Sequence, residues 1–147
     1  ALRLMAATEQ VDMTKTDSAK TLIGEYMAVE TDSAKKVEAQ RILGDVYLAA
    51  GNADNAIIEY KKVLEIEPND ADALAGLGLS LVNTAYKVDG SIDKAKMQEA
   101  ANYLQRFTEV APANHKYMDD AKGLIASLKK EQNVTPQKTS PARRRNN

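Results

Sequence analysis

An internal repeat restricts the fold of this chain more than any other feature of its sequence. Three landmarks of the first copy return in the second, a Leu-Gly pair after 34 residues and an alanine and a proline each after 44 residues (Leu43-Gly44 and Leu77-Gly78; Ala56 and Ala100; Pro68 and Pro112). The second copy is therefore the first with about ten residues inserted between its two halves. Because each unit of a repeat protein buries its apolar face against the next unit, this pattern predicts a stack of similar elements.

The repeated unit reads as two helices. The chain has 147 residues, which fits one domain of ordinary size, and it contains one Phe and no Trp. Alanine is abundant, and Leu, Lys, Glu and Met are well represented; these residues lose little conformational freedom in a helix. The composition therefore favours an all-α protein.

Small residues and prolines explain how such helices would meet and end. Gly44 and Gly78 have no Cβ, so the two helices of each hairpin can approach closely. Gly51 precedes Asn52 in a turn signal between the two helices. Pro68 disfavours the helical conformation for the residue before it, and Asn69-Asp70 can then cap the next helix. We interpret these residues as scaffold rather than as ligand contacts.

Together these residues resemble the tetratricopeptide repeat. The family pattern has a Leu-Gly pair and a Tyr in the first helix, and an Ala, an aromatic residue and a final Pro in or after the second. The matching residues of the first copy are Leu43, Gly44, Tyr47, Ala56, Tyr60 and Pro68. Those of the second are Leu77, Gly78, Leu81, Ala100, Leu104, Phe107 and Pro112. Gln40 replaces the usual early Trp, and the match covers residues 37–112.

The resemblance implies an all-α, tetratricopeptide-type helical-hairpin solenoid with about three hairpins, the first degenerate, plus a C-terminal capping helix. We expect a degenerate hairpin over 1–36, in which residues 2–13 pair with a helix over 18–30 capped by Asp17 or Ser18. Two repeats follow, over 37–70 and 71–112, the second with an insertion near 86–98 in which Asp93 can cap the following helix. A capping helix over 113–130 precedes a basic tail over 131–147, which we expect to be disordered.

The insertion near 86–98 has two readings. Asp89-Gly90-Ser91 reads as a turn at the tip of two helices that project beyond the body. It is either a tolerated loop extension or a docking finger.

In this family the first helices of successive hairpins line a concave surface that binds partners. Carried over by position, the partner-binding residues are Glu38, Arg41, Asp45, Leu48, Asp72, Ala75, Leu79, Val82 and Asn83. Relatives that clamp a terminal carboxylate use Lys, Asn and Arg here, but Asp45 and Gly76 occupy two Asn places. The resemblance therefore implies an apolar strip edged by carboxylates, suited to a peptide with apolar anchors and some basic character. The alternative is that these residues contact the molecule's own N-terminal helices.

Catalytic chemistry and cofactors are not indicated. The chain has no Cys and one His, His115, which we read as an exposed or capping residue. Asp89 to Asp93 supply too few carboxylates for a calcium loop, and Gly76 and Gly78 follow no strand. We predict no catalytic residue, no metal site and no cofactor, and hence no enzyme.

The expected function is a protein-interaction module, either an adaptor or a subunit of a larger complex. One alternative is a self-associating structural subunit. The other is weak binding of nucleic acid or an anionic surface through Arg143, Arg144 and Arg145, in a tail of net charge +3. No apolar run approaches the ~20 residues of a membrane span, so we expect a soluble protein. Ala1 is either a processed or a cut N-terminus, and the compartment, cytoplasmic or periplasmic, stays open.

Overall fold

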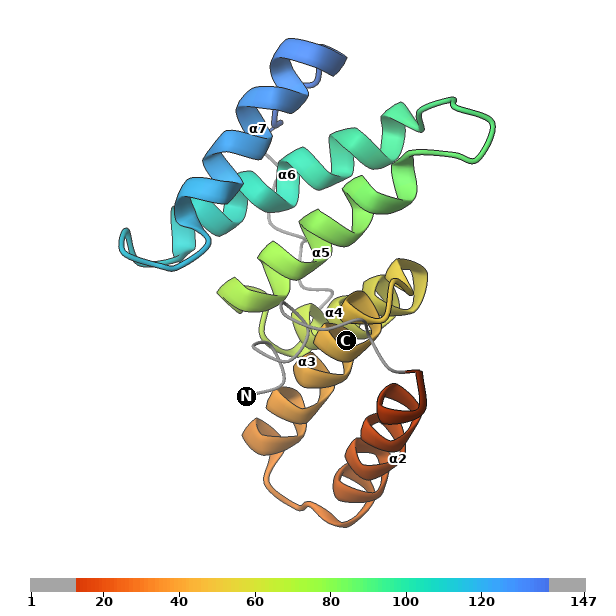
Figure 1. Cartoon of the computed structure of the whole chain (residues 1–147). Helices are drawn as coiled ribbons and strands as arrows, with labels where there is room; N and C mark the ends of the chain where they lie inside the picture. The colour runs from red at the N-terminus through yellow and green to blue at the C-terminus, as the bar shows by residue number, and fades with distance from the viewer. Residues whose placement is uncertain (1–12, 138–147) are drawn as a thin grey trace, which may run out of the picture.

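The computed structural model describes residues 13–137 and contains six α-helices within that range (Figure 1). They are α2 (Met13–Val29), α3 (Ser33–Ala49), α4 (Ala53–Ile66), α5 (Ala71–Ala85), α6 (Lys94–Val110) and α7 (Met118–Gln132). The expected partner helix over 2–13 therefore lies almost wholly outside the described residues, as do the three arginines of the tail.

Each helix packs on the next one along the chain, and the array stays open. The α3–α4 and α5–α6 hairpins stack through α4 and α5, with α2 on one end and α7 on the other (Figure 1). Beyond these sequential contacts, α3 and α5 also touch, whereas α4 and α6 make no comparable contact. The array therefore curves toward its α3–α5 side. The expected all-α solenoid of helical hairpins is confirmed.

Four helices begin at a side-chain cap. Each capping residue accepts a hydrogen bond from the backbone amide three residues later, at 2.7–3.3 Å (Asp32, Asn52, Asp70 and Asp93). Gly51 has a φ of 75°, a left-handed conformation that glycine adopts without strain, and it forms the turn between α3 and α4. The expected caps at Asp70 and Asp93 are confirmed; Asp70 fixes where the α5–α6 hairpin starts, and Asp93 fixes where its second helix starts.

The ring of Tyr60 lies between two glycines of neighbouring helices. Tyr60 is fully buried on α4. A methyl group built on Gly44 of α3 would lie 2.7 Å from its Cε1 atom, and one on Gly76 of α5 would lie 2.4 Å from its Cζ atom. The third close approach is within the second hairpin, where a methyl group on Gly78 would lie 2.6 Å from Leu104 Cγ. Glycine is thus what allows an aromatic ring to fill the space between the two repeats.

A polar contact stands where the family usually has its early Trp. Gln40 on α3 donates a hydrogen bond to Glu59 on α4, and Lys62 makes an ion pair with the same carboxylate at 3.1 Å. Glu59 is 8% exposed, so its charge requires such partners. The hydrogen bond from Gln40 therefore joins the two helices of the first hairpin here, and Lys62 neutralises its acceptor from within α4.

The N-terminal helix differs from the expectation in its start and in its exposed face. It begins at Met13, so Asp17 and Ser18 lie inside α2 and are not its caps. Its apolar residues cover a broad arc: Ile23 and Met27 are half-buried, and Lys20 Nζ lies 5.4 Å from the centre of the Tyr47 ring on α3. Three others, here called the α2 stripe, are 42–78% exposed (Leu22, Tyr26 and Val29). Packing against α3 therefore buries only some of the apolar residues of α2.

The C-terminal helix ends in a motif that orders the first residues of the expected tail. Asn133 adopts a left-handed conformation with φ 54°, and the amide of Val134 donates to the carbonyl of Leu128 at 3.1 Å. Leu128 and Val134 are both buried. Gln98 on α6 donates to the carbonyl of Thr135 at 2.7 Å. Residues 131–137 are thus helical or docked on α6, unlike the disorder expected from their composition, because Asn133 turns the chain back.

The carboxylate of Glu30 closes the turn between α2 and α3. It accepts hydrogen bonds from the backbone amides of Asp32 and Thr31, both at 2.8 Å, and from the Tyr26 hydroxyl at 2.7 Å. The amide of Asp32, then the Tyr26 hydroxyl, lower the pKa of Glu30 from 4.5 to about 2, and desolvation opposes them. These bonds favour the charged form.

We therefore expect Glu30 to titrate with a midpoint near 2 in an NMR pH titration of its side-chain carbon. Because the folded pKa is depressed, its contribution to stability is complete above pH 4.5 and is lost as the pH falls through 2. Tyr26→Phe removes one donor and should raise the midpoint. A midpoint near 4.5 in the unmodified protein contradicts this account of the turn.

Candidate partner-binding face

The residues expected to bind a partner lie on α3 and α5, the two helices that touch on the concave side. Apart from the adjacent pair Val82 and Asn83, their spacing of three or four residues places each set on one face of its helix. Four come from α3 and five from α5 (Glu38, Arg41, Asp45 and Leu48; Asp72, Ala75, Leu79, Val82 and Asn83). Neighbouring helices thus present the two sets on adjacent surfaces.

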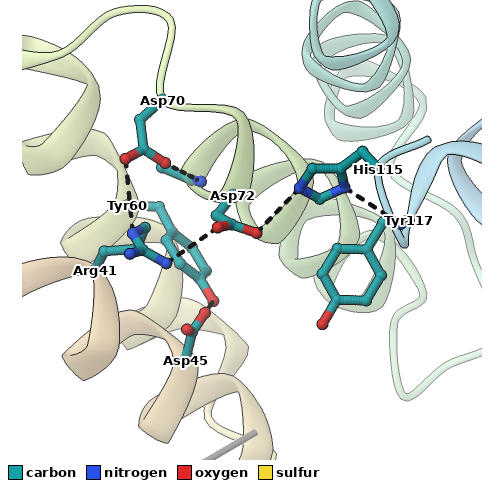
Figure 2. Close-up of polar contacts among 8 residues, drawn as sticks. Arg41, Asp45, Tyr60, Asp70, Asp72, His115 and Tyr117 are labelled. Atoms are coloured by element: carbon teal, nitrogen blue, oxygen red, sulfur yellow. Dashed lines mark hydrogen bonds and ion pairs between the residues drawn. The ribbon is translucent and has the colours of Figure 1, made fainter. Parts of the chain in front are cut away.

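Much of the polar half of this face is engaged within the molecule. Arg41 Nη1 lies 3.2 Å from Asp72 Oδ2, and Arg41 Nε lies 3.6 Å from Asp70 Oδ2 (Figure 2). From the core side, the Tyr60 hydroxyl donates to Asp45 Oδ1 at 2.6 Å (Figure 2). A partner therefore meets Arg41, Asp45 and Asp72 as a fixed arrangement whose charges are already partly compensated.

The single histidine belongs to the same network. His115 Nε2 lies 3.5 Å from Asp72 Oδ1, while its Nδ1 accepts from the Tyr117 amide at 3.3 Å (Figure 2). Its ring stacks edge-on against Phe107 at 5.0 Å between centroids. The network thus links α3, the start of α5 and the segment before α7. We expected an exposed or a capping residue at this position. His115 is instead half-buried, and both of its ring nitrogens have partners.

The remaining predicted residues divide by exposure. Leu79 is 43% exposed, and Glu38 and Asn83 are also exposed. Leu48 and Ala75 are half-buried. Val82 is only 7% exposed and belongs to the core, so its side chain offers a partner little surface. The apolar part of this face therefore centres on Leu79.

The inserted segment forms a compact finger, defined here as residues 86–92. Tyr86 and Ile92 form an isolated antiparallel bridge, and the Lys87 amide donates to the Ser91 carbonyl at 2.9 Å. Ser91 donates to Asp89 Oδ1 through both its hydroxyl and its amide, and these bonds lower the pKa of Asp89. Figure 1 shows this loop extending past the end of the α5–α6 hairpin.

A hollow of about 340 Å³ lies between the base of the finger and the first repeat. Leu48 and Asn83 of the predicted face also line it, so the hollow continues that face. Its other walls come from the α3–α4 turn and the start of α4 (Gly51, Asn52, Ala53 and Asp54), and from the end of α5, the base of the finger and the start of α6 (Thr84, Tyr86 and Lys96). Reasoning from the sequence missed these seven residues. The position of the insertion between α5 and α6 was the one signal that pointed to this edge.

Within residues 13–137 no group of three or more His, Asp or Glu side chains is arranged to hold a metal ion. None of the helices described there has the length and apolar character needed to cross a membrane.

Comparison with known protein families gives a match. A family model described as "TPR repeat" matches residues 44–84, from the second half of α3 through α5. No curated protein and no solved structure matches the chain.

Proposed function

Because residues 44–84 make this chain a tetratricopeptide-repeat protein, we propose that it binds a segment of another protein on its α3–α5 face. Repeats of this family are in general protein-interaction modules, and the chain would act as an adaptor or as a subunit of a larger complex. In support, α3 and α5 contact each other on this side, and Glu38, Leu79 and Asn83 of the two helices are exposed.

The observation that carries the proposal is the exposure of Leu79. Leu79 is 43% exposed, the most exposed apolar residue of the α3–α5 face, and ion pairs and a hydrogen bond fix the polar residues Arg41, Asp45 and Asp72 of the same face. A rigid arrangement loses little conformational entropy when a partner binds. Leu79 is thus suited to serve as the apolar anchor of the face.

The charges of the α3–α5 face favour a partner with basic character. Four carboxylates lie on or beside this face against the single guanidinium of Arg41 (Glu38, Asp45, Asp70 and Asp72). A partner segment with an apolar side chain and at least one Lys or Arg complements this surface. Since the face spans only two described hairpins, we expect modest affinity for a single segment and stronger binding in a multivalent complex.

The proposal gives His115 no catalytic role, because both of its ring nitrogens already have partners within the molecule. Family members of this kind are typically scaffolds without enzymatic activity. Binding of nucleic acid or an anionic surface through Arg143 to Arg145 stays a prediction, since those residues lie outside the described part.

We expect Leu79→Glu to reduce partner binding at least about tenfold while the helical circular dichroism stays unchanged. The substitution places a carboxylate where an apolar anchor should dock, beside other carboxylates. The measurement is a quantitative pull-down from the native source, followed by mass spectrometry. Ile58→Glu is the matched control, because Ile58 is similarly exposed, at 50%, but lies on α4. Equal recovery of partners by both variants would remove this face from consideration.

A further inference from the structure

We propose that the hollow beside the finger is a second recognition site, for an extended peptide in which one apolar side chain lies between a basic and an acidic residue. This inference rests on the proposed function, since the peptide is a continuation of the partner segment on the α3–α5 face. Leu48 and Asn83 lie on that face and also line the hollow, so a chain can pass from one to the other.

The size of the hollow suits a short stretch of chain. Its volume of about 340 Å³ is at the lower end of the range for ligand pockets. The apolar and aromatic residues that line it are Leu48, Ala53 and Tyr86, which come from both repeats. One apolar side chain of the peptide would fill the space between them.

Two amide side chains in the walls match the main chain of an extended peptide. Asn52 uses its Oδ1 atom to cap α4, accepting from the Asn55 amide at 3.3 Å, and its NH₂ group can donate to a carbonyl. Asn83 is exposed and carries both a donor and an acceptor, the same pair that a peptide group presents. Such contacts bind a backbone without regard to its side chains.

The charges in the walls of the hollow determine which charged residues the peptide carries on either side of its apolar side chain. Asp54 and Lys96 both line the hollow, and neither forms an ion pair within residues 13–137, with each other or with another group. A basic side chain of the peptide would meet Asp54, and an acidic one would meet Lys96. Opposite charges at the two positions fix the direction in which the peptide lies.

The finger holds its wall in place before binding. Tyr86 is 54% exposed at the base of the finger, where its bridge to Ile92 and the bond from the Asp93 amide to the Ala85 carbonyl, at 2.8 Å, fix the backbone. Val88 lies in the same finger, fully exposed, but does not line the hollow. Substitution of Tyr86 therefore tests the hollow, and substitution of Val88 tests the part of the finger outside it.

The test begins with a display library of random eight-residue peptides selected on the full chain. The best binder is synthesised and titrated into ¹⁵N-labelled protein, where the side-chain NH₂ signals of Asn52 and Asn83 should shift. Tyr86→Ala should weaken binding about five- to tenfold, and Val88→Ala should leave it unchanged. The double variant Asp54→Lys with Lys96→Glu should prefer the peptide with its two charged residues exchanged.

Three results would overturn the proposal, and they differ in whether the proposed function survives. Equal affinities for Tyr86→Ala and Val88→Ala, with Leu79→Glu still abolishing binding, exclude the hollow but keep the proposed function. If Leu79→Glu still binds the peptide and Tyr86→Ala does not, the hollow is a site on its own. The peptide then does not extend onto the α3–α5 face, which contradicts the inference. Failure of the library to yield any binder counts against both.

Discussion

Tyr60→Ala is expected to lower the free energy of unfolding by about 3–5 kcal/mol, the range for removing a buried aromatic side chain. The ring is fully buried and lies between Gly44 and Gly76, so its loss leaves a cavity that two backbones cannot close. Chemical denaturation followed by circular dichroism measures the change.

Two control variants separate the sources of this effect. Tyr60→Phe keeps the ring and removes the hydroxyl that donates to Asp45, so it should cost only about 1 kcal/mol. Tyr86→Ala removes an aromatic ring that is 54% exposed, and should cost well under half as much as Tyr60→Ala. Similar losses for Tyr60→Ala and Tyr86→Ala would show that Tyr60 does not join the two repeats.

Gly76→Ala is expected to lower the free energy of unfolding by about 1–3 kcal/mol, the usual cost of overpacking a core. Alanine is the better helix former by about 1 kcal/mol, so intrinsic propensity predicts the opposite sign. The new methyl group would lie 2.4 Å from Tyr60 Cζ, and the ring cannot retreat because Gly44 lies against it on the other helix.

Gly123→Ala is the matched control for Gly76→Ala. Gly123 lies in the interior of α7, and a methyl group there meets no atom within 4 Å, so this variant should be more stable by about 0.5–1 kcal/mol. In a Tyr60→Ala background, Gly76→Ala should lose its cost, because the clashing ring is gone. Independent, additive effects of the two substitutions would contradict the proposed packing.

The repeat made much of this fold predictable. Glycine, alanine and proline recur at fixed distances because each meets a local steric requirement, and the structure places Gly44 and Gly78 at close approaches within their hairpins. The caps at Asp70 and Asp93 were predictable for the same reason, since an N-cap depends on the residues directly after it. Features that depend on neighbouring residues, such as helix caps, could therefore be predicted from the sequence.

Contacts between distant residues were not predictable in this way. The sequence did not predict the packing role of Gly76, because that role follows from the position of a ring sixteen residues earlier on another helix. The polar residues of the α3–α5 face were assigned to a partner by position. That Arg41 and His115 both reach Asp72 depends on how α3, α5 and the segment before α7 converge.

The end of the chain shows the same limit. Composition suggested disorder from Glu131 onward, but one residue in a left-handed conformation directs Val134 into the core. The hollow likewise needs the α3–α4 turn and the finger to be placed side by side.

The two ends of the described array differ in chemical character, and so they differ in what it costs to cover them. The outer residues of α7 include Asp119, Lys122 and Lys129, so a helix laid against them would have to strip water from charges. The α2 stripe, by contrast, would gain from being covered by any apolar neighbour. Among residues 13–137, the α2 end should therefore accept an apolar neighbour at a lower desolvation cost than the α7 end.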